Sequence, residues 1–94
     1  MYAKKDLSQI SKNLLLMANW IETCGWCQGR THGPHDEVCI MGAGYRTIYD
    51  YPGKTYMALN NHLKQEPAAW NDEKGRTKEQ VLIMLKELAY NLDE

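Results

Sequence analysis

Two stretches of apolar residues at helical spacing, one near each end of the chain, most strongly limit how this sequence can fold. The first consists of Leu7, Ile10, Leu14, Met17, Ala18 and Ile21. The second consists of Val81, Leu85, Leu88 and Leu92, flanked by Leu82, Met84 and Ala89. Because residues three or four positions apart share one face of an α-helix, each stretch predicts a helix with one buried side. We expect these helices over residues 6–23 and 77–91.

Polar residues at the start of each stretch, and a glycine after the first one, predict the helix ends. The two capping pairs are Asp6 with Gln9 and Thr77 with Gln80. In such a pair each side chain binds a backbone N–H that the first turn leaves free. Gly25 can adopt the left-handed conformation that ends a helix. Leu16 and Trp20 lie away from the main apolar stripe, so we expect the first helix to be central, between several neighbours.

The middle of the chain predicts two shorter helices and a glycine-rich loop. The second helix is predicted from Met41, Tyr45 and Ile48, and the third from Tyr56, Leu59 and Leu63. Pro67 ends the third helix. Residues 25–38 predict a loop or short hairpin that turns at Gly33 and Pro34. The prediction is therefore a single, mainly α domain over residues 1–94, a compact bundle of four helices with this loop across one end.

Charge balance and the length of the apolar runs exclude several function classes. Eleven Lys and Arg stand against twelve Asp and Glu, which gives a formal net charge of −1. Without clustered cations to displace counterions from phosphates, nucleic acid is not an expected partner. The longest apolar run, residues 14–18, is far shorter than the roughly 20 residues that span a bilayer, so no membrane partner is expected. The polar N-terminal segment and the odd number of cysteines, three, predict a cytoplasmic location.

Five residues with metal-binding side chains lie in or beside the predicted loop. They are Cys24, Cys27, His32, His35 and Cys39. The first two have zinc-knuckle spacing, but six residues separate His32 from Cys39 and no second such cysteine pair follows. We therefore favour a protein without a cofactor, and the alternative is a small zinc-stabilised module that uses this loop. A redox dithiol is disfavoured, because the helix dipole opposes a thiolate at the C-terminal end of the first helix.

The aromatic residues favour a binding role. The chain has three Trp and six Tyr but no Phe, and Trp and Tyr combine an apolar body with a polar group that suits interfaces. We expect Trp20 and Trp70 in the core and Trp26 exposed on the loop. Ile83 and Tyr90 project opposite the stripe of the last helix. The predicted partner-binding residues are Trp26, Gln28, Arg30, Ile83 and Tyr90, with a homodimer as an alternative. No catalytic motif or phosphate loop is present, so no enzymatic activity is expected.

Three short motifs, taken in order, resemble one protein family. They are Gly25-Trp26-Cys27-Gln28-Gly29, then Cys39-x-x-Gly42-Ala43, then Trp70-Asn71-Asp72 followed by Gly75-Arg76-Thr77. This pattern is similar to DUF6197, a family of short uncharacterised proteins from actinobacteria and bacteriophages, and it covers most of the chain. The resemblance brings no established activity, substrate or cofactor. For a phage-encoded chain it implies the host cytoplasm as the location.

The motif residues have structural explanations that need no catalysis. Asn71 or Asp72 is expected to bind free backbone N–H groups at a turn, Arg76 to pair with Asp72, and Thr77 to cap the last helix. Gly42 is expected to let two helices approach closely. The predicted function is a small non-catalytic protein-binding module. The specific form that the resemblance implies is a phage accessory protein that modulates or inhibits a host defence protein.

Overall fold

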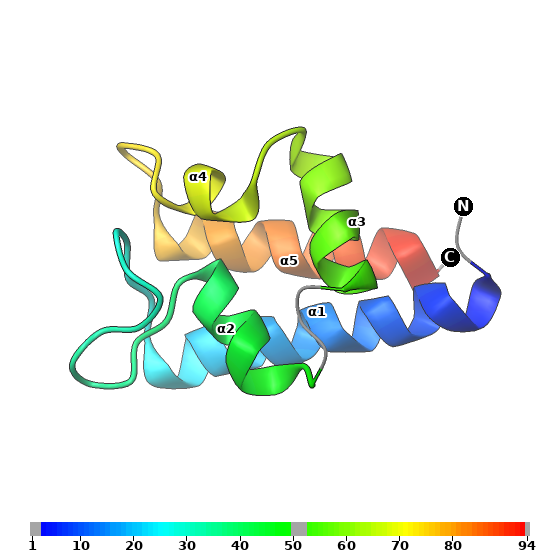
Figure 1. Ribbon diagram of the computed structural model, residues 1–94, viewed down its shortest axis with the longest axis horizontal. Helices are drawn as coiled ribbons and strands as arrows, with labels where there is room; N and C mark the ends of the chain where they lie inside the picture. Colours follow the sequence, from blue (N-terminus) through cyan, green and yellow to red (C-terminus); the bar gives the residue numbers. More distant parts are fainter. Residues whose placement is uncertain (1–2, 50–52, 94) are drawn as a thin grey trace.

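The computed structural model describes residues 3–49 and 53–93, and this part of the chain contains five α-helices (Figure 1). They are α1 (Lys4–Cys24), α2 (Ile40–Thr47), α3 (Lys54–Leu63), α4 (Pro67–Asn71) and α5 (Lys78–Asp93). The mainly α prediction is confirmed. The four predicted helices correspond to α1, α2, α3 and α5, and α4 is an additional short helix. None of the described helices is both long and apolar enough to cross a membrane.

The core lies where α1 and α5, from opposite ends of the sequence, run side by side in opposite directions (Figure 1). The largest side chains that the two helices bury almost completely are Ile10, Leu14, Met17, Ile21, Val81 and Leu85. The hydroxyl of Ser11 donates a 2.8 Å hydrogen bond to the carbonyl of Ala89, so a polar group within this contact is satisfied. Because α1 also contacts α2 and α3, its central position agrees with the prediction. Leu16 nevertheless remains exposed, and Trp20 is half-buried against the core.

The start of α1 differs from the predicted capping pair. The helix begins two residues earlier, after Ala3, whose side chain makes no capping hydrogen bond. Asp6 lies in the first turn, and its carboxylate forms a 3.0 Å ion pair with Lys54 of α3. The predicted role of Asp6 as a cap is therefore wrong, because this carboxylate binds a side chain that is distant in the sequence.

Gly25 ends α1 with a backbone conformation that favours glycine. Its N–H donates to the carbonyl of Ile21, and its φ is +105°. Its ψ of 167° is extended, so Gly25 does not adopt the left-handed helical conformation that we predicted. The chain consequently leaves the helix in an extended direction, into the loop of residues 26–39.

The predicted capping box at the start of α5 is present. The N–H of Gln80 donates to the hydroxyl of Thr77, and the N–H of Thr77 donates to the side-chain oxygen of Gln80, both at 3.1 Å. Before this turn, Pro67 occupies the first position of α4, where its missing N–H costs nothing. The third predicted helix, α3, ends at Leu63 before Lys64 in the left-handed conformation, and Pro67 instead begins the short helix that the apolar periodicity did not reveal.

Gly42 in α2 permits a close approach, but its neighbour is a loop. A Cβ atom at this position would overlap the carbonyl oxygen of Thr31. The predicted contact between two helices at Gly42 is therefore corrected to a contact between α2 and the loop backbone. A glycine is required because a backbone carbonyl cannot move aside as a flexible side chain can.

Candidate functional site

The loop of residues 25–39 is folded back on itself at one end of the helical bundle (Figure 1). Val38 is fully buried and forms isolated β-bridges with Trp26 and His32. Its N–H donates to the carbonyl of Gly25, and its carbonyl accepts from the N–H of Cys27. Backbone hydrogen bonds therefore hold the loop, with Val38 bridged in parallel to Trp26 and antiparallel to His32, in the position that the sequence predicts.

Asn71, the last residue of α4, joins this loop to the helices. Its side chain is completely buried, with an exposed fraction of 0 %. The side-chain oxygen accepts from the indole N–H of Trp26 at 2.7 Å and from the N–H of Ile40 at 3.2 Å. The side-chain nitrogen donates to the carbonyl of Cys27 at 3.1 Å and to the carboxylate of Asp72 at 2.9 Å. All the hydrogen-bonding capacity of this amide is used. We call these four bonds the Asn71 network.

Gln28 and Gly29 continue the same connection at the surface. The side-chain nitrogen of Gln28 donates to the carbonyls of Asn71 and Glu73, at 2.9 and 3.0 Å. The N–H of Gly29 donates to the carboxylate of Asp72 at 2.9 Å. The first and third family-like motifs therefore bind each other, although more than 40 positions separate them along the chain.

Arg76 fixes the turn between α4 and α5. Its guanidinium lies over the ring of Trp70, 3.7 Å from the ring centroid, and its Nε donates to the Trp70 carbonyl at 3.0 Å. Its terminal nitrogen forms a 2.9 Å ion pair with Glu73. The predicted pairing of Arg76 with Asp72 is wrong, because Asp72 accepts from Gly29 and Asn71 instead. Trp70 is half-buried against the core.

The sulfur of Cys39 caps α2. It accepts a 3.4 Å hydrogen bond from the N–H of Gly42. Burial raises the pKa of the Cys39 thiol and also that of Cys27, whose sulfur donates to the carbonyl of Arg30. A raised pKa disfavours the thiolate, which is the reactive and metal-binding form of cysteine. Cys24 is the last residue of α1, at the unfavourable end of the helix dipole.

The five predicted metal ligands do not form a metal centre in this structure. Among the residues that the structure describes, no three Cys, His, Asp or Glu side chains lie close enough together to hold an ion. His32 and His35 are exposed on the loop, whereas Cys39 is buried beneath it. The geometry therefore gives no support to the zinc-stabilised alternative.

The predicted partner-binding residues separate into two groups. Trp26 is half-buried against the core, so the expectation that it is exposed is wrong. Gln28 is exposed, but its amide already binds two carbonyls within the chain. Arg30 is exposed at the loop, whereas Ile83 and Tyr90 are exposed on α5, with exposed fractions of 53 % and 62 %. The sequence identified the α5 pair from its helical position, but it had no signal for the contacts of Trp26 with α4.

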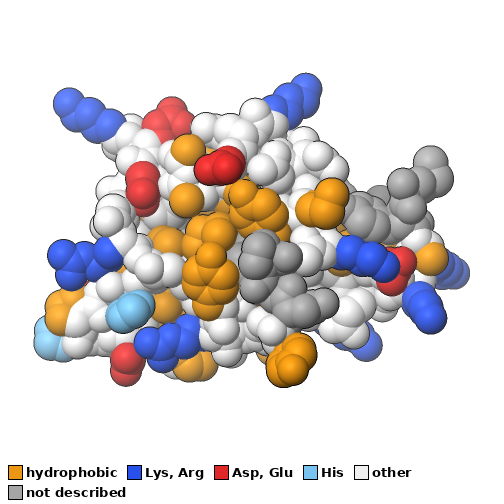
Figure 2. Space-filling view, viewed as in Figure 1, with side chains coloured by type: hydrophobic (Ala, Val, Ile, Leu, Met, Phe, Trp, Pro, Cys, Tyr) orange, Lys and Arg blue, Asp and Glu red, His pale blue; other side chains and the backbone are white. Residues whose placement is uncertain are grey.

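The surface carries both apolar and charged side chains. Figure 2 shows one face, on which hydrophobic side chains gather near the centre while Lys and Arg side chains lie mostly toward the edge. Leu15 and Leu16 on α1 are also exposed, by 36 % and 50 %, and they line a shallow depression with Lys12 and Asn19. The apolar periodicity had placed Leu16 off the main stripe, but it did not single out this depression.

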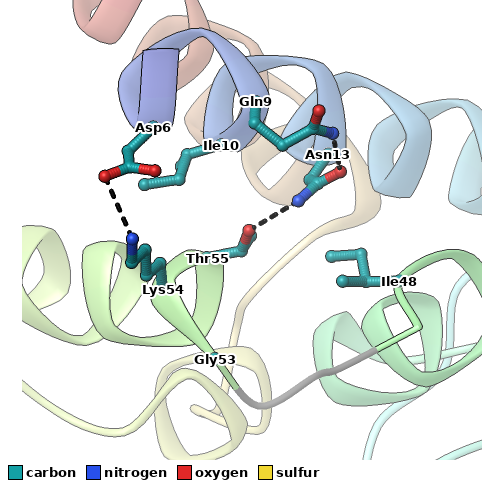
Figure 3. A pocket seen from close by; sticks show the side chains of 8 residues that line it. All are labelled: Asp6, Gln9, Ile10, Asn13, Ile48, Gly53, Lys54 and Thr55. Atoms are coloured by element: carbon teal, nitrogen blue, oxygen red, sulfur yellow. Dashed lines mark hydrogen bonds and ion pairs between the residues drawn. The ribbon is translucent and has the colours of Figure 1, made fainter. Parts of the chain in front are cut away.

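A polar crevice lies between the first half of α1 and the start of α3 (Figure 3). It has a volume of about 260 Å³ and includes the ion pair between Asp6 and Lys54. The side-chain nitrogen of Asn13 donates to the hydroxyl of Thr55 at 2.9 Å. The hydrogen bond from Lys54 lowers the pKa of Asp6. Because these polar groups bind one another, the lining residues that the structure describes offer a paired carboxylate and ammonium rather than a poised acid or base.

Comparison with known proteins places the chain in a family. Neither the curated proteins nor the solved structures contain a significant match. The family model for DUF6197, a family of unknown function, matches residues 7–91, from the first turns of α1 to the last turn of α5. The matched region includes every residue of the Asn71 network. The chain therefore belongs to the family of unknown function DUF6197.

Proposed function

We propose that this protein is a non-catalytic protein-binding module and that the outer side of α5 contacts its partner. The observation that carries this proposal is the exposure of Ile83 and Tyr90, both more than half exposed. They are seven residues apart, about two helical turns, and therefore project from the same side of α5. The opposite side already buries a complete apolar stripe, so the fold does not need these two side chains.

The surroundings of Ile83 and Tyr90 suit a protein interface. Exposed Glu79 and Glu87 and half-buried Lys86 lie on the same helix. Apolar or aromatic anchors surrounded by polar residues are typical of the energetically important centre of an interface. Tyr90 adds a hydroxyl that can hydrogen-bond at the edge of such a contact.

The internal use of the motif residues also supports this choice of surface. The indole N–H of Trp26 donates to the side chain of Asn71, and the side-chain amide of Gln28 donates to the carbonyls of Asn71 and Glu73. Trp26 and Gln28 are therefore not part of the proposed interface. Arg30 lies exposed on the loop and is a secondary candidate. The motifs then hold the fold together, and partner recognition uses residues outside them.

A more specific form of the proposal concerns the partner. We propose an accessory protein of a phage that acts in the host cytoplasm on a host protein, such as a component of a defence system. The support is the small size, the balanced charge and the resemblance of the motifs to those of phage proteins.

Site-specific cross-linking tests the proposal. A photoreactive amino acid at Tyr90 is expected to cross-link one protein in cells of the bacterium in which the gene is found, and mass spectrometry identifies that protein. The purified partner is then expected to bind Ile83→Lys about tenfold more weakly than wild type, a loss of about 1.4 kcal/mol. Met57→Lys, at an equally exposed apolar position of α3, is the matched control and is expected to bind normally. Equal affinity of wild type and Ile83→Lys would exclude this surface.

A further inference from the structure

The outer side of α1 combines an apolar centre with charges that are separated by sign. Leu15 and Leu16 line the depression with Lys12 and Asn19. Toward the start of the helix the exposed side carries Lys4 and Lys5, and near its end it carries Glu22. We call Lys12, Leu15, Leu16, Asn19 and Glu22 the α1 face.

The charges of the α1 face run against the helix dipole. The N-terminal end of a helix carries a partial positive charge and favours acidic side chains, and the C-terminal end favours basic ones. Here Lys4 and Lys5 share the first turn with Asp6, whose carboxylate is paired with Lys54, and the last turn contains no basic residue. Within the chain, Glu22 has a 3.6 Å ion pair with Lys86, which is exposed and therefore weak. This distribution of charges stabilises α1 poorly as an isolated helix. It suits contact with a second helix that runs antiparallel to α1 and carries the opposite charge at each end.

We propose that a second copy of this chain binds the α1 face, with the two α1 helices packed antiparallel about a two-fold axis. A register that sets Leu15 opposite Leu16 of the second copy sets Lys12 opposite Asn19 of that copy. Glu22 of the second copy then lies three residues further along, about 4.5 Å, within reach of the Lys12 side chain. The two-fold axis produces each contact twice. Each Lys12 therefore lies near Glu22 of the other copy, and the two helix dipoles run antiparallel.

The size of the α1 face sets the strength of this dimer. A helix of 21 residues is about 31 Å long, and one such helix against another buries less than the roughly 800 Å² per partner of a standard interface. The dimer is therefore weak, with a Kd between about 1 µM and 1 mM. A monomer and a dimer in concentration-dependent exchange are expected.

Sedimentation velocity over a series of protein concentrations tests the proposal with charge-reversed variants. Lys12→Glu places two acidic residues together across the axis, and Glu22→Lys places two basic residues together. Each variant alone is expected to dimerise about tenfold more weakly than wild type. An equimolar mixture of the two is expected to form a heterodimer, because both contacts then join opposite charges. Circular dichroism checks that each variant is folded.

Two further variants separate the α1 face from the rest of the surface. Leu16→Lys is expected to abolish dimerisation, and Ile83→Lys on α5 is expected to leave it unchanged. A monomeric mass for wild type at every concentration would overturn the proposal. So would a dimer that persists in Leu16→Lys, or folded charge variants that do not combine when mixed. These results do not bear on the proposed interface of α5, because Ile83→Lys tests that interface by its affinity for a different protein.

Discussion

The indole N–H of Trp26 donates a 2.7 Å hydrogen bond to the side-chain oxygen of Asn71, 45 residues further along the chain. The same oxygen accepts from the N–H of Ile40, at the start of α2. One buried amide thus binds the loop, α2 and α4 together. The family motifs that contain Trp26 and Asn71 are explained by this contact, which requires an indole donor at one position and an amide at the other.

Replacing Asn71 is expected to destabilise the protein strongly. In Asn71→Leu the indole of Trp26, the N–H of Ile40 and the carbonyl of Cys27 lose their partner, and each unsatisfied buried group costs about 1–3 kcal/mol. We expect the free energy of unfolding to fall by about 3 kcal/mol, measured by urea denaturation. Asn91→Leu, at an exposed position of α5, is the control and is expected to change it by less than about 0.5 kcal/mol. Equal effects of the two substitutions would show that the Asn71 network does not stabilise the fold.

Gly42→Ala is expected to destabilise the protein more than Gly29→Ala, because Gly29 has a positive φ but open space around it. The added methyl group would overlap the carbonyl of Thr31, so either the loop or α2 must move, at a cost of about 2–3 kcal/mol. Gly29 has a φ of +77°, but no atom lies within 4 Å of the place that a Cβ would occupy, so Gly29→Ala is expected to cost only about 1 kcal/mol. Thermal unfolding of the two variants compares these costs. If Gly42→Ala were neutral or stabilising, as helix propensity alone predicts, the contact with Thr31 would be refuted.

The ion pair between Asp6 and Lys54 is expected to make stability depend on pH. The hydrogen bond from Lys54 lowers the pKa of Asp6 below its ordinary value of 3.8. A lowered native pKa means that the unfolded chain takes up the proton first as the pH falls. The ionised Asp6 carboxylate therefore contributes fully to the free energy of unfolding at any pH above its ordinary pKa. This contribution is lost as the pH falls through the lower pKa of the folded protein. Urea unfolding of wild type and Asp6→Asn should differ at pH 7, and the difference should shrink as the pH falls below 3.8, the ordinary pKa of the carboxyl. Glu87→Gln is the control for the removal of one negative charge.

A chelator is expected to leave the protein folded. The five Cys and His side chains of residues 24–39 do not gather around one point, and the thiols of Cys27 and Cys39 have raised pKa values. Thermal unfolding with and without EDTA is therefore expected to give the same Tm. About one zinc per purified chain, together with unfolding on chelation, would instead establish the zinc-stabilised alternative.

The helices and the α5 cap could be predicted because their signals are local. The spacing from Val81 to Leu92 and the pair of Thr77 and Gln80 lie within a few turns of each other, and helix geometry alone relates them. The position of Ile83 and Tyr90 follows from the same geometry. The additional helix α4 has only five residues, too few for an apolar period to show.

The contacts of the motif residues could not be predicted, because their partners are distant in the sequence. Nothing near Trp26 indicates that an amide 45 residues away binds its indole, so an exposed loop residue was the natural expectation. Similarly, the charge of Asp72 indicated a partner for Arg76, whereas the fold uses Asp72 to accept the N–H of Gly29. The roles of these residues are set by tertiary structure, and a sequence pattern identifies only that they belong together.

The pairing of α1 with α5 also determines when this protein can fold during its synthesis. The apolar side of α1 leaves the ribosome well before α5, the helix that covers it, is made. Until then the side chains that α5 covers remain exposed to water, among them Leu14, Met17 and Ile21. A nascent chain with such exposed apolar surface is bound by chaperones. A stop codon that removes α5 would accordingly yield an aggregating or degraded fragment, with none of the earlier helices held in place.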